Sequence, residues 1–295
     1  MQAQRSRCRV FHSSYYRHAK GRWVKTVTTV HDLAYELGFV GSGFRSAMHK
    51  LEHRRAFFAS DALICVSERT RADLLDVYPA LAQRCRIDVA HHGVWMPTPA
   101  PIPATPGRDK WSAPYVLFVG GRGAYKNFAA AMKAFAVGGF AREGWYLVCT
   151  GAPLNDTERR QASKFGIADS VRGVGPIDRG RLSSLYAGAH ALLYPSLFEG
   201  FGMPLLEAMS LGCPVVASNT SVMPEIAGDA ALLVDGGDPH KLAAALQSLS
   251  NVQERAALTM RGRSRASTFT WDRSASRHAA VYLSLGGIDV AQNAS

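Results

Sequence analysis

Short apolar runs rich in β-branched residues alternate with helical patterns along most of the 295-residue chain. Six regular runs occupy the second part, at residues 115–120, 145–151, 171–175, 191–196, 214–218 and 231–235. Parallel strands need long crossover connections, and a helix is the usual one. The pattern therefore predicts an α/β fold with a doubly wound parallel sheet in this part of the chain.

Helical patterns separate most of these runs. They span residues 127–137, 156–165, 179–187 and 204–211, with a further helix starting at Asp238-Pro239 and a terminal one over 271–285. Asp238 has the residue type of an N-cap, and Pro239 suits the first helical turn.

Three further strand-like runs come earlier, at 24–30, 62–66 and 86–90. Between the two sets, residues 96–107 hold five prolines in twelve residues, which disfavours helix and predicts an extended linker. We therefore predict a first domain over residues 1–100, a linker over 101–113, a second domain over 114–270 and a terminal helix with its tail over 271–295.

The formal net charge is +11, and the excess is uneven. Residues 1–31 hold seven Lys or Arg and no acid, and the stretch 255–277 is rich in arginine. Such patches favour an anionic partner, whether a nucleotide diphosphate, an anionic membrane or nucleic acid, and charge alone does not choose among them. The chain has no recognisable nucleic-acid-binding motif, so no nucleic-acid partner is predicted.

The five cysteines are scattered and form no C-x-x-C pair, which favours a reducing compartment and argues against a zinc site. No apolar run approaches the roughly 18 residues of a spanning helix. No apolar signal core follows the basic N-terminal stretch. These features predict a cytoplasmic protein, and the basic ends are compatible with peripheral contact at the inner face of an anionic membrane.

The most informative stretch is HALLYPSLFEGFGMPLLEAMSLGCPVVAS, at 190–218. A predicted strand leads into a loop with Gly200 and Gly202, and a helix then opens at Pro204. A glycine-rich loop that feeds a helix N-terminus forms an anion site, because backbone N–H groups and the helix dipole point at the ligand. Glu199 and Glu207 flank this loop. A diphosphate would repel them, so they make better sense as acceptors for sugar hydroxyls on either side of it.

The segment Glu199-Gly-Phe-Gly-Met-Pro-Leu-Leu-Glu207 resembles the signature of retaining glycosyltransferases of the group 1 or family four type. That family has the GT-B fold, with two Rossmann-like domains, and includes bacterial mannosyl- and glucosyltransferases of surface polysaccharide assembly. The resemblance implies that Glu199 contacts the donor-sugar hydroxyls and that Glu207 accepts hydrogen bonds from the ribose. Backbone N–H groups of Gly200, Phe201 and Gly202 would hold the sugar and the phosphates.

Residues 116–127, VLFVGGRGAYKN, resemble the family's phosphate-binding strand and turn, with Gly120 and Gly121 in the turn. Lys126 follows Gly120 by six residues, as in the family, and would meet the diphosphate as a point charge. Arg122 would meet the diphosphate bidentately. In many relatives, however, the arginine follows the first glycine directly, whereas Gly121 intervenes here.

Two other segments match the family. Val174 and Gly175, in the loop 173–176, would lie against the nucleobase. His31, in TTVHDLAYE at 28–36, would contact the donor sugar near the reacting carbon. Full-length relatives have a longer segment before the His-Asp pair, so the resemblance implies an N-terminally truncated chain. We expect an incomplete first domain of three strands with a basic, poorly packed N-terminal part.

The resemblance implies transfer of a hexose, mannose or glucose, from a UDP- or GDP-linked donor to an acceptor hydroxyl with retention, in polysaccharide or lipopolysaccharide synthesis. The partners would be the nucleotide sugar and a glycan or lipid-linked acceptor. No cofactor and no metal ion are expected, since no Asp-x-Asp pair lies near the donor segment.

Two alternatives stay open. One is a nucleotide-sugar-binding remnant without catalysis, because the first domain is short. The other is a nicotinamide-dependent dehydrogenase, which needs G-x-G-x-x-G straight after a strand and an acid about 20 residues further on. GGRGAYKN does not fit that spacing.

Overall fold

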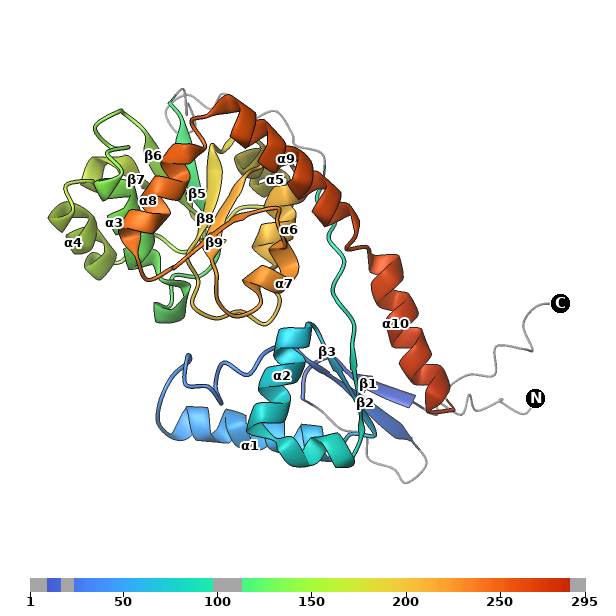
Figure 1. Ribbon diagram of the computed structural model, residues 1–295. Coiled ribbons are helices and arrows are strands. Elements are labelled where there is room, and N and C mark those ends of the chain that lie inside the picture. The colour runs from blue at the N-terminus through green and yellow to red at the C-terminus, as the bar shows by residue number, and fades with distance from the viewer. Residues whose placement is uncertain (1–9, 17–23, 98–112, 287–295) are drawn as a thin grey trace, which may run out of the picture. The chain divides into compact units, whose positions relative to one another are not determined.

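The computed structural model describes residues 10–16, 24–97 and 113–286, and the chain divides into two compact units (Figure 1). The first unit comprises Met1–Gly93 together with Thr270–Ser295, and the second comprises Val94–Phe269. The terminal helix thus joins the first unit. All but the last residue of the predicted linker lies outside the described residues.

The first unit contains a four-stranded parallel sheet in the order β1-β2-β3-β4. Its strands are β1 (Val10–Ser13), β2 (Lys25–Val30), β3 (Ala62–Cys65) and β4 (Arg86–Val89). The expectation of three strands was wrong, because β1 adds a fourth at the edge and pairs with β2. β1 is only four residues long and lacks the apolar run that marks the other strands.

Helices cover both faces of this sheet. Leu63 and Cys65 face a core shared with α1 (Phe44–Phe58) and α2 (Glu68–Val77). Ala62 and Ile64 face the other way, toward Val281 of α10 (Trp271–Ser284). The short helix η1 (Pro79–Gln83) leads into β4. Since the side chains of a strand alternate in direction, one apolar strand supplies two cores. The basic N-terminal part that we expected to be poorly packed lies mostly outside the described residues, at 1–9 and 17–23.

The second unit contains the predicted six-stranded parallel sheet, in the order β10-β9-β8-β5-β6-β7. Its strands are β5 (Tyr115–Phe118), β6 (Tyr146–Cys149), β7 (Val171–Gly173), β8 (Ala191–Tyr194), β9 (Val215–Ser218) and β10 (Leu232–Val234). They end up to two residues earlier than predicted, because the small residues that follow them already form turns.

The helices of this unit match most of the predicted segments. They are η2 (Ala124–Lys126), α3 (Phe128–Val137), α4 (Asp156–Lys164), η3 (Ala168–Ser170), α5 (Arg179–Gly188), α6 (Met203–Ser210), α7 (Met223–Ala227), α8 (Pro239–Ser248) and α9 (Val252–Ser267). Asp238 caps α8 as predicted, accepting hydrogen bonds from the N–H groups of His240 and Lys241. The sequence did not predict α9.

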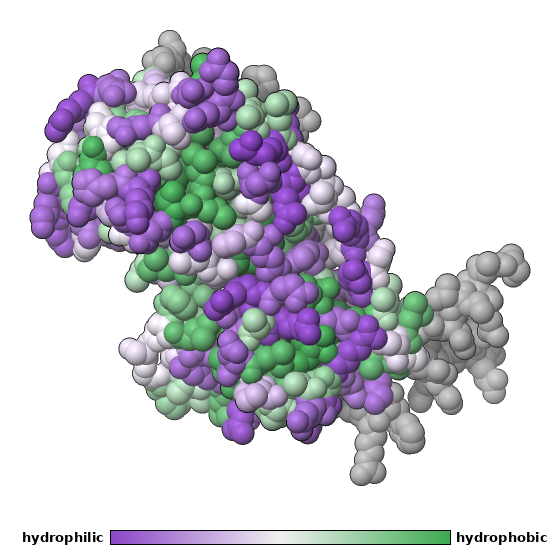
Figure 2. Space-filling view, viewed as in Figure 1, coloured by the Kyte–Doolittle hydropathy of each residue, from purple (hydrophilic) through white to green (hydrophobic). Residues whose placement is uncertain are grey.

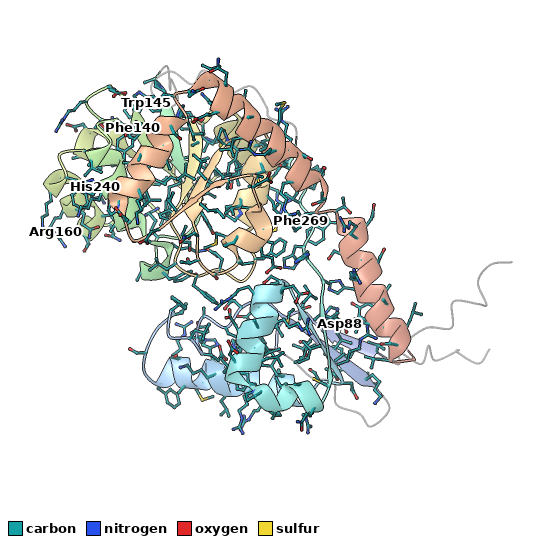
Figure 3. The ribbon with its side chains drawn as sticks, viewed as in Figure 1. Asp88, Phe140, Trp145, Arg160, His240 and Phe269 are labelled. Atoms are coloured by element: carbon teal, nitrogen blue, oxygen red, sulfur yellow. The ribbon has the colours of Figure 1, made fainter. Side chains whose placement is uncertain are left out.

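Aromatic side chains fill one end of this core. The rings of Phe140 and Trp145 lie 5.2 Å apart between their centroids, and Trp145 meets His190 edge-on at 4.7 Å (Figure 3). In the space-filling view, hydrophobic residues reach the surface of each unit among hydrophilic ones (Figure 2).

The arginines of α9 have structural partners. Arg265 donates to the carbonyls of Ile226 and Glu225 at 2.8 and 2.6 Å, and Arg261 donates to the carbonyl of Asp229 at 2.9 Å. Basic side chains suit carbonyls that a helix end leaves unpaired. Arg261 and Arg265 of the arginine-rich stretch therefore have a structural role, because they hold α7 and the residues after it in place.

Candidate donor site

The strand order of the second unit identifies where a ligand would bind. β5 and β8 are neighbours, although β6 and β7 separate them in sequence. From β5 the chain runs outward to β7 and then returns to β8 to continue in the other direction. In open α/β sheets ligands bind beyond the carboxyl ends of strands at such a reversal. The loops that follow β5 and β8 carry Lys126 and Glu199, two of the predicted donor-site residues.

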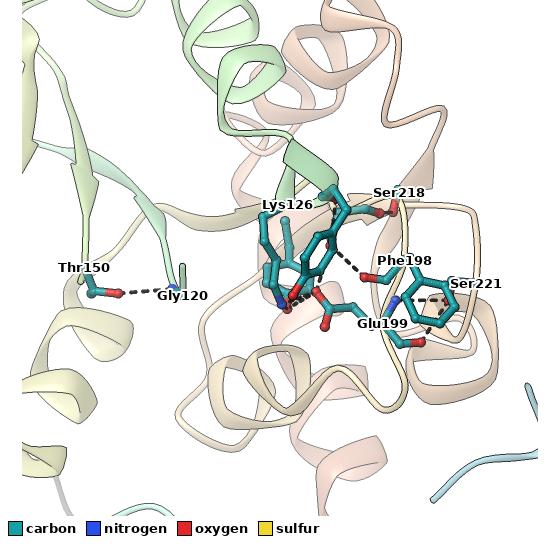
Figure 4. Close-up of polar contacts among 10 residues, drawn as sticks. Gly120, Lys126, Thr150, Phe198, Glu199, Ser218 and Ser221 are labelled. Atoms are coloured by element: carbon teal, nitrogen blue, oxygen red, sulfur yellow. Dashed lines mark hydrogen bonds and ion pairs between the residues drawn. The ribbon is translucent and has the colours of Figure 1, made fainter. Parts of the chain in front are cut away.

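Lys126 and Glu199 meet at this point (Figure 4). Nζ of Lys126 lies 2.5 Å from Oε1 of Glu199, and both side chains are mostly buried. The hydroxyls of Tyr194 and Ser196 donate to the same oxygen at 2.6 and 2.7 Å. The other oxygen, Oε2, makes no hydrogen bond to any residue in the described part of the chain. One oxygen therefore anchors the carboxylate and the other is left for a ligand.

The backbone around Lys126 fixes its position. Lys126 ends the short helix η2, and Asn127 follows in the left-handed region with φ 56°. Asn is one of the few residues that adopt this conformation readily. Its side-chain amide donates to the carbonyl of Gly236 at 2.8 Å, which ties the turn to the loop before α8.

The helix start at α6 has the features expected of an anion site. Gly202 is its N-cap in the left-handed region, and Pro204 stands at the second helical position, one later than predicted. No side chain in the described residues caps this helix start. Phe201 is buried, and its ring meets that of Phe269 at 6.1 Å. The phenyl group thus packs the glycine loop against the residues that follow α9.

Glu207, on α6, accepts a hydrogen bond from the hydroxyl of Tyr186 at 2.9 Å. Burial raises the pKa of the Glu207 carboxyl, while the Tyr186 hydrogen bond and the charge of Arg179 oppose that rise. Burial, followed by the charge of Glu207, raises the pKa of Tyr186 well above its usual value. A half-buried carboxylate with one partner retains acceptor capacity for a ligand hydroxyl.

The guanidinium of Arg122 is used within the protein. Nε donates to Glu158 at 2.8 Å, Nη1 to the carbonyl of Thr150 at 3.0 Å, and Nη2 to the carbonyls of Ala152 and Pro153 at 2.6 and 2.9 Å. The side chains of Arg122 and Glu158 are 6% and 9% exposed. Arg122 thus joins the loop after β5 to the loop after β6.

The glycine turn lies in the same loop. The N–H of Gly120 donates to the hydroxyl of Thr150 at 3.2 Å, and Gly120 has φ 113°, which other residues rarely adopt. Gly121 follows it and is exposed. The predicted base-contacting residues lie after β7, where the N–H of Val174 donates to the carbonyl of Cys149 at 3.0 Å and Gly175 has φ 71°.

His31 belongs to the first unit and follows β2. Its Nε2 lies 3.0 Å from the carbonyl oxygen of Ser14, and its ring stacks on that of His92 at 5.8 Å. Within the described residues, no group of three or more His, Cys, Asp or Glu side chains is placed to hold a metal ion.

Comparison with known families decides the class of protein. The family model described as glycosyl transferases group 1 matches residues 108–265, and the model described as Glycosyltransferase Family 4 matches residues 2–95. The chain belongs to the group 1 glycosyl transferases. The chain is therefore a member of a transferase enzyme family, and the two family models lie on its two units.

Relatives extend along most of this group 1 glycosyl transferase. It is 30% identical to the O-antigen chain mannosyltransferase B of Escherichia coli over 264 residues, which are 85% of this chain and 68% of that protein. It is 29% identical to the D-inositol 3-phosphate glycosyltransferase of Thermobispora bispora, covering 90% of this chain and 66% of that one. The corresponding enzyme of Salinispora tropica is 30% identical, and 58% of its length is covered.

Solved structures confirm the GT-B fold. The sucrose-phosphate synthase of Thermosynechococcus elongatus matches with a TM-score of 0.73 at 22% identity, over 94% of this chain and 74% of that one. A glycosyltransferase involved in lipopolysaccharide biosynthesis matches with a TM-score of 0.68 at 20% identity, over 87% and 74%. At these identities the likeness concerns the fold alone.

Proposed function

We propose that this group 1 glycosyl transferase binds a nucleotide-diphosphate sugar in its second unit and transfers the hexose to an acceptor hydroxyl. The observation that carries the proposal is the meeting of Lys126 and Glu199 at the point where the strand order reverses. A cation and a carboxylate held side by side there match a ligand that joins an anionic diphosphate to a polyhydroxylated sugar.

The diphosphate is assigned first to Lys126. Its ammonium now pairs with Glu199, and a bound diphosphate would bring more negative charge to the same place. The start of α6 and the glycine loop before it would contribute backbone N–H groups and the helix dipole. Arg122 is given a secondary part, because four hydrogen bonds already engage its guanidinium.

The two glutamates would recognise the two sugars of the donor. Glu199 would accept hydrogen bonds from hydroxyls of the transferred hexose through Oε2. Glu207 would accept from the ribose, and Val174 and Gly175 would lie against the base. The contact of His31 with the donor sugar stays a prediction of the family resemblance.

Retention follows in this proposal from a front-face displacement. The bond between the anomeric carbon and the leaving phosphate oxygen breaks, and the acceptor oxygen bonds to that carbon on the same face. The acceptor proton passes to the leaving phosphate oxygen. Lys126 and the α6 start lower the barrier by stabilising the negative charge that develops on the diphosphate.

The relatives' names suggest the sugar and the pathway. One is a mannosyltransferase named for an O-antigen chain, so mannose or glucose transfer to a glycan or lipid-linked acceptor in polysaccharide assembly is the reaction to test. UDP and GDP are both candidates for the donor nucleotide.

Contact with an anionic membrane in the cytoplasm belongs to the same proposal. No helix in the described residues is long and apolar enough to span a bilayer. The first turns of α1 expose Phe44, at 83%, Arg45 and Met48, and its last turns expose Arg54 and Arg55. Exposed aromatic and basic side chains on one helix suit an anionic interface.

Calorimetric titration with UDP, GDP and NAD tests the donor site, and nucleotide release from UDP-glucose or GDP-mannose tests turnover. Saturable binding of UDP or GDP but not NAD, with turnover, supports the proposal. Binding without turnover under any acceptor condition favours a nucleotide-sugar-binding protein instead. A cooperatively folded chain that binds neither nucleotide contradicts the proposal.

A further inference from the structure

Ser221 lies in the loop that follows β9, next to the loop that carries Glu199 (Figure 4). Its φ is 55°, so it is a side-chain-bearing residue in the left-handed region. Serine disfavours this conformation, and such strain persists only where surrounding contacts hold it. Those contacts are therefore the feature to explain.

The hydroxyl of Ser221 binds both backbone groups of Glu199. It accepts from the Glu199 N–H at 3.1 Å and donates to the Glu199 carbonyl oxygen at 2.9 Å. The two residues are 22 positions apart in the sequence. One side chain from the β9 loop thus supplies both the donor and the acceptor that the backbone of Glu199 requires.

The side chain of Glu199 is fixed separately. Lys126, Tyr194 and Ser196 all donate to Oε1, from the loop after β5, from β8 and from the residues just after β8. Glu199 is consequently held at two points, with its carboxylate held by these three side chains and its main chain by Ser221. Holding it at both ends determines the direction in which Oε2 points.

We propose that Ser221 is a positioning residue for Glu199, and that it sets the preference of the site for a nucleotide sugar over the free nucleotide. The proposal rests on the proposed function, in which Glu199 contacts the donor sugar. Ser221 acts through Glu199 and does not contact the donor itself. Preorganised acceptors bind more tightly because less conformational freedom is lost on binding.

A change at Ser221 should affect only recognition of the sugar, because the residues assigned to the diphosphate and the ribose lie elsewhere. Lys126 and Glu207 lie on other loops and helices, and within the described residues their side chains form no hydrogen bond or ion pair with Ser221. Removing the Ser221 hydroxyl should therefore weaken contact with the sugar and leave contact with the diphosphate and ribose intact.

The experiment compares Ser221→Gly and Ser221→Ala with Glu199→Gln and the wild-type chain. Both Ser221 variants remove the hydroxyl, but glycine relieves the left-handed backbone and alanine does not. Ser248→Ala, which removes a hydroxyl that bonds a carbonyl at the end of α8, is the matched control. For each protein, calorimetry measures the dissociation constants of UDP, GDP, UDP-glucose and GDP-mannose. The readout is the dissociation constant of the free nucleotide divided by that of the corresponding nucleotide sugar.

The wild-type ratio should show tighter binding of one nucleotide sugar than of its nucleotide. We expect both Ser221 variants to lower this preference by roughly tenfold with free-nucleotide affinity unchanged, and we expect Glu199→Gln to lower the preference at least as much. Ser248→Ala should retain the wild-type preference. A general packing defect would instead lower both affinities together, and a purely conformational role would spare Ser221→Gly.

Two results overturn the inference and are distinguishable. If the wild-type chain and Glu199→Gln differ in sugar preference but both Ser221 variants match the wild type, the positioning role is wrong while the proposed function stands. If the wild-type chain shows no preference for any nucleotide sugar, the proposed function fails, and the role of Ser221 fails with it.

Discussion

Nζ of Lys126 lies 2.5 Å from Oε1 of Glu199, and the two residues follow adjacent strands, β5 and β8. The family resemblance gave them separate tasks, on the diphosphate and on the donor sugar. In the proposed function their contact links these tasks, because an incoming diphosphate would compete with Glu199 for the ammonium. Tyr194 and Ser196 would then keep the carboxylate in place through their hydrogen bonds to Oε1.

Replacing Lys126 should remove most of the attraction for the diphosphate. We expect Lys126→Ala to weaken UDP or GDP binding about tenfold to a hundredfold, the usual range for a charged hydrogen bond. Lys133→Ala, on the exposed face of α3, is the control for loss of a positive charge and should bind as the wild type does. Equal nucleotide affinities for the two variants, measured by calorimetry, would remove Lys126 from the site.

Glu207→Gln should separate ribose recognition from diphosphate recognition. The amide is a weaker acceptor than the carboxylate, so affinity for UDP or GDP should fall by about tenfold. Inorganic pyrophosphate has no ribose, and its affinity should be unchanged. A parallel loss for pyrophosphate would mean that Glu207 acts on the helix start rather than on the ribose.

The same variant should alter the dependence of stability on pH. Because burial raises the pKa of the Glu207 carboxyl, the folded protein binds more protons than the unfolded chain just above the usual pKa of a glutamate. The contribution of Glu207 to the free energy of unfolding therefore falls as the pH rises through that window. Glu207→Gln does not titrate and lacks this loss. The free energy of unfolding of the variant minus that of the wild type, measured in urea, should therefore be larger at pH 7 than at pH 4.

Arg122→Ala should damage stability more than any other change in the glycine turn. The variant leaves the buried carboxylate of Glu158 without its cation, a loss of about 3 kcal/mol in the free energy of unfolding. Adding Glu158→Gln removes that charge but keeps an acceptor for the N–H of Asn155, so the double variant should regain part of the loss. If the losses in free energy of unfolding from the two single variants add up in the double variant, measured by urea denaturation, the ion pair contributes nothing to stability.

The sheet of the second unit could be predicted from sequence because its four inner strands, β5, β6, β8 and β9, are largely buried apolar runs with turn signals after them. The glycine loop and the helix start at α6 were predictable for a similar reason, since Gly202, Pro204 and Gly212 are local signals. The edge strand β1 could not be predicted. Its sequence, VFHS, lies in a basic segment without an apolar run and forms a strand by pairing with β2.

The hydrogen bonds and ion pairs between loops that hold the site residues in place could not be predicted from the sequence. Nothing in the sequence near Ser221 indicates that its hydroxyl reaches Glu199, and nothing near Arg122 indicates that Glu158 will engage it. Both contacts join loops that follow different strands. They depend on the order of strands in the sheet, which a residue pattern does not contain.

The exposed aromatic and basic side chains of α1 should direct the protein to anionic vesicles. Each basic side chain near an anionic surface contributes about 1 kcal/mol. We therefore expect Arg54→Glu with Arg55→Glu to lower sedimentation with phosphatidylglycerol vesicles at least about tenfold, and Phe44→Ser to lower it less. Met260→Ser, at another exposed apolar position, on α9, is the control. Vesicle binding that survives the double charge change would place the membrane contact elsewhere.

Acid should loosen the first unit through two histidines. Burial, followed by the nearby charges of His278 and His31, lowers the pKa of His12 from 6.5 to about 4, and burial similarly lowers that of His92 to about 4. Between these values the unfolded chain binds protons that the folded protein does not. The free energy of unfolding therefore falls as the pH drops from 6.5 to about 4, with the loss complete below that range.

His12 joins β1 to α10, since Nδ1 lies 2.5 Å from the hydroxyl of Tyr282 and Nε2 lies 2.8 Å from that of Thr29. His12→Gln keeps groups that can hydrogen-bond but does not titrate, so its stability should fall less steeply with acid, by on the order of 1 kcal/mol over the window. His240→Gln, at the exposed start of α8, should follow the wild-type curve. Urea unfolding monitored by Trp271 fluorescence, with the other tryptophans replaced by Phe, follows this unit, because Trp271 lies beside His92. Parallel curves for His12→Gln and wild type would show that His12 does not couple acid to the docking of α10.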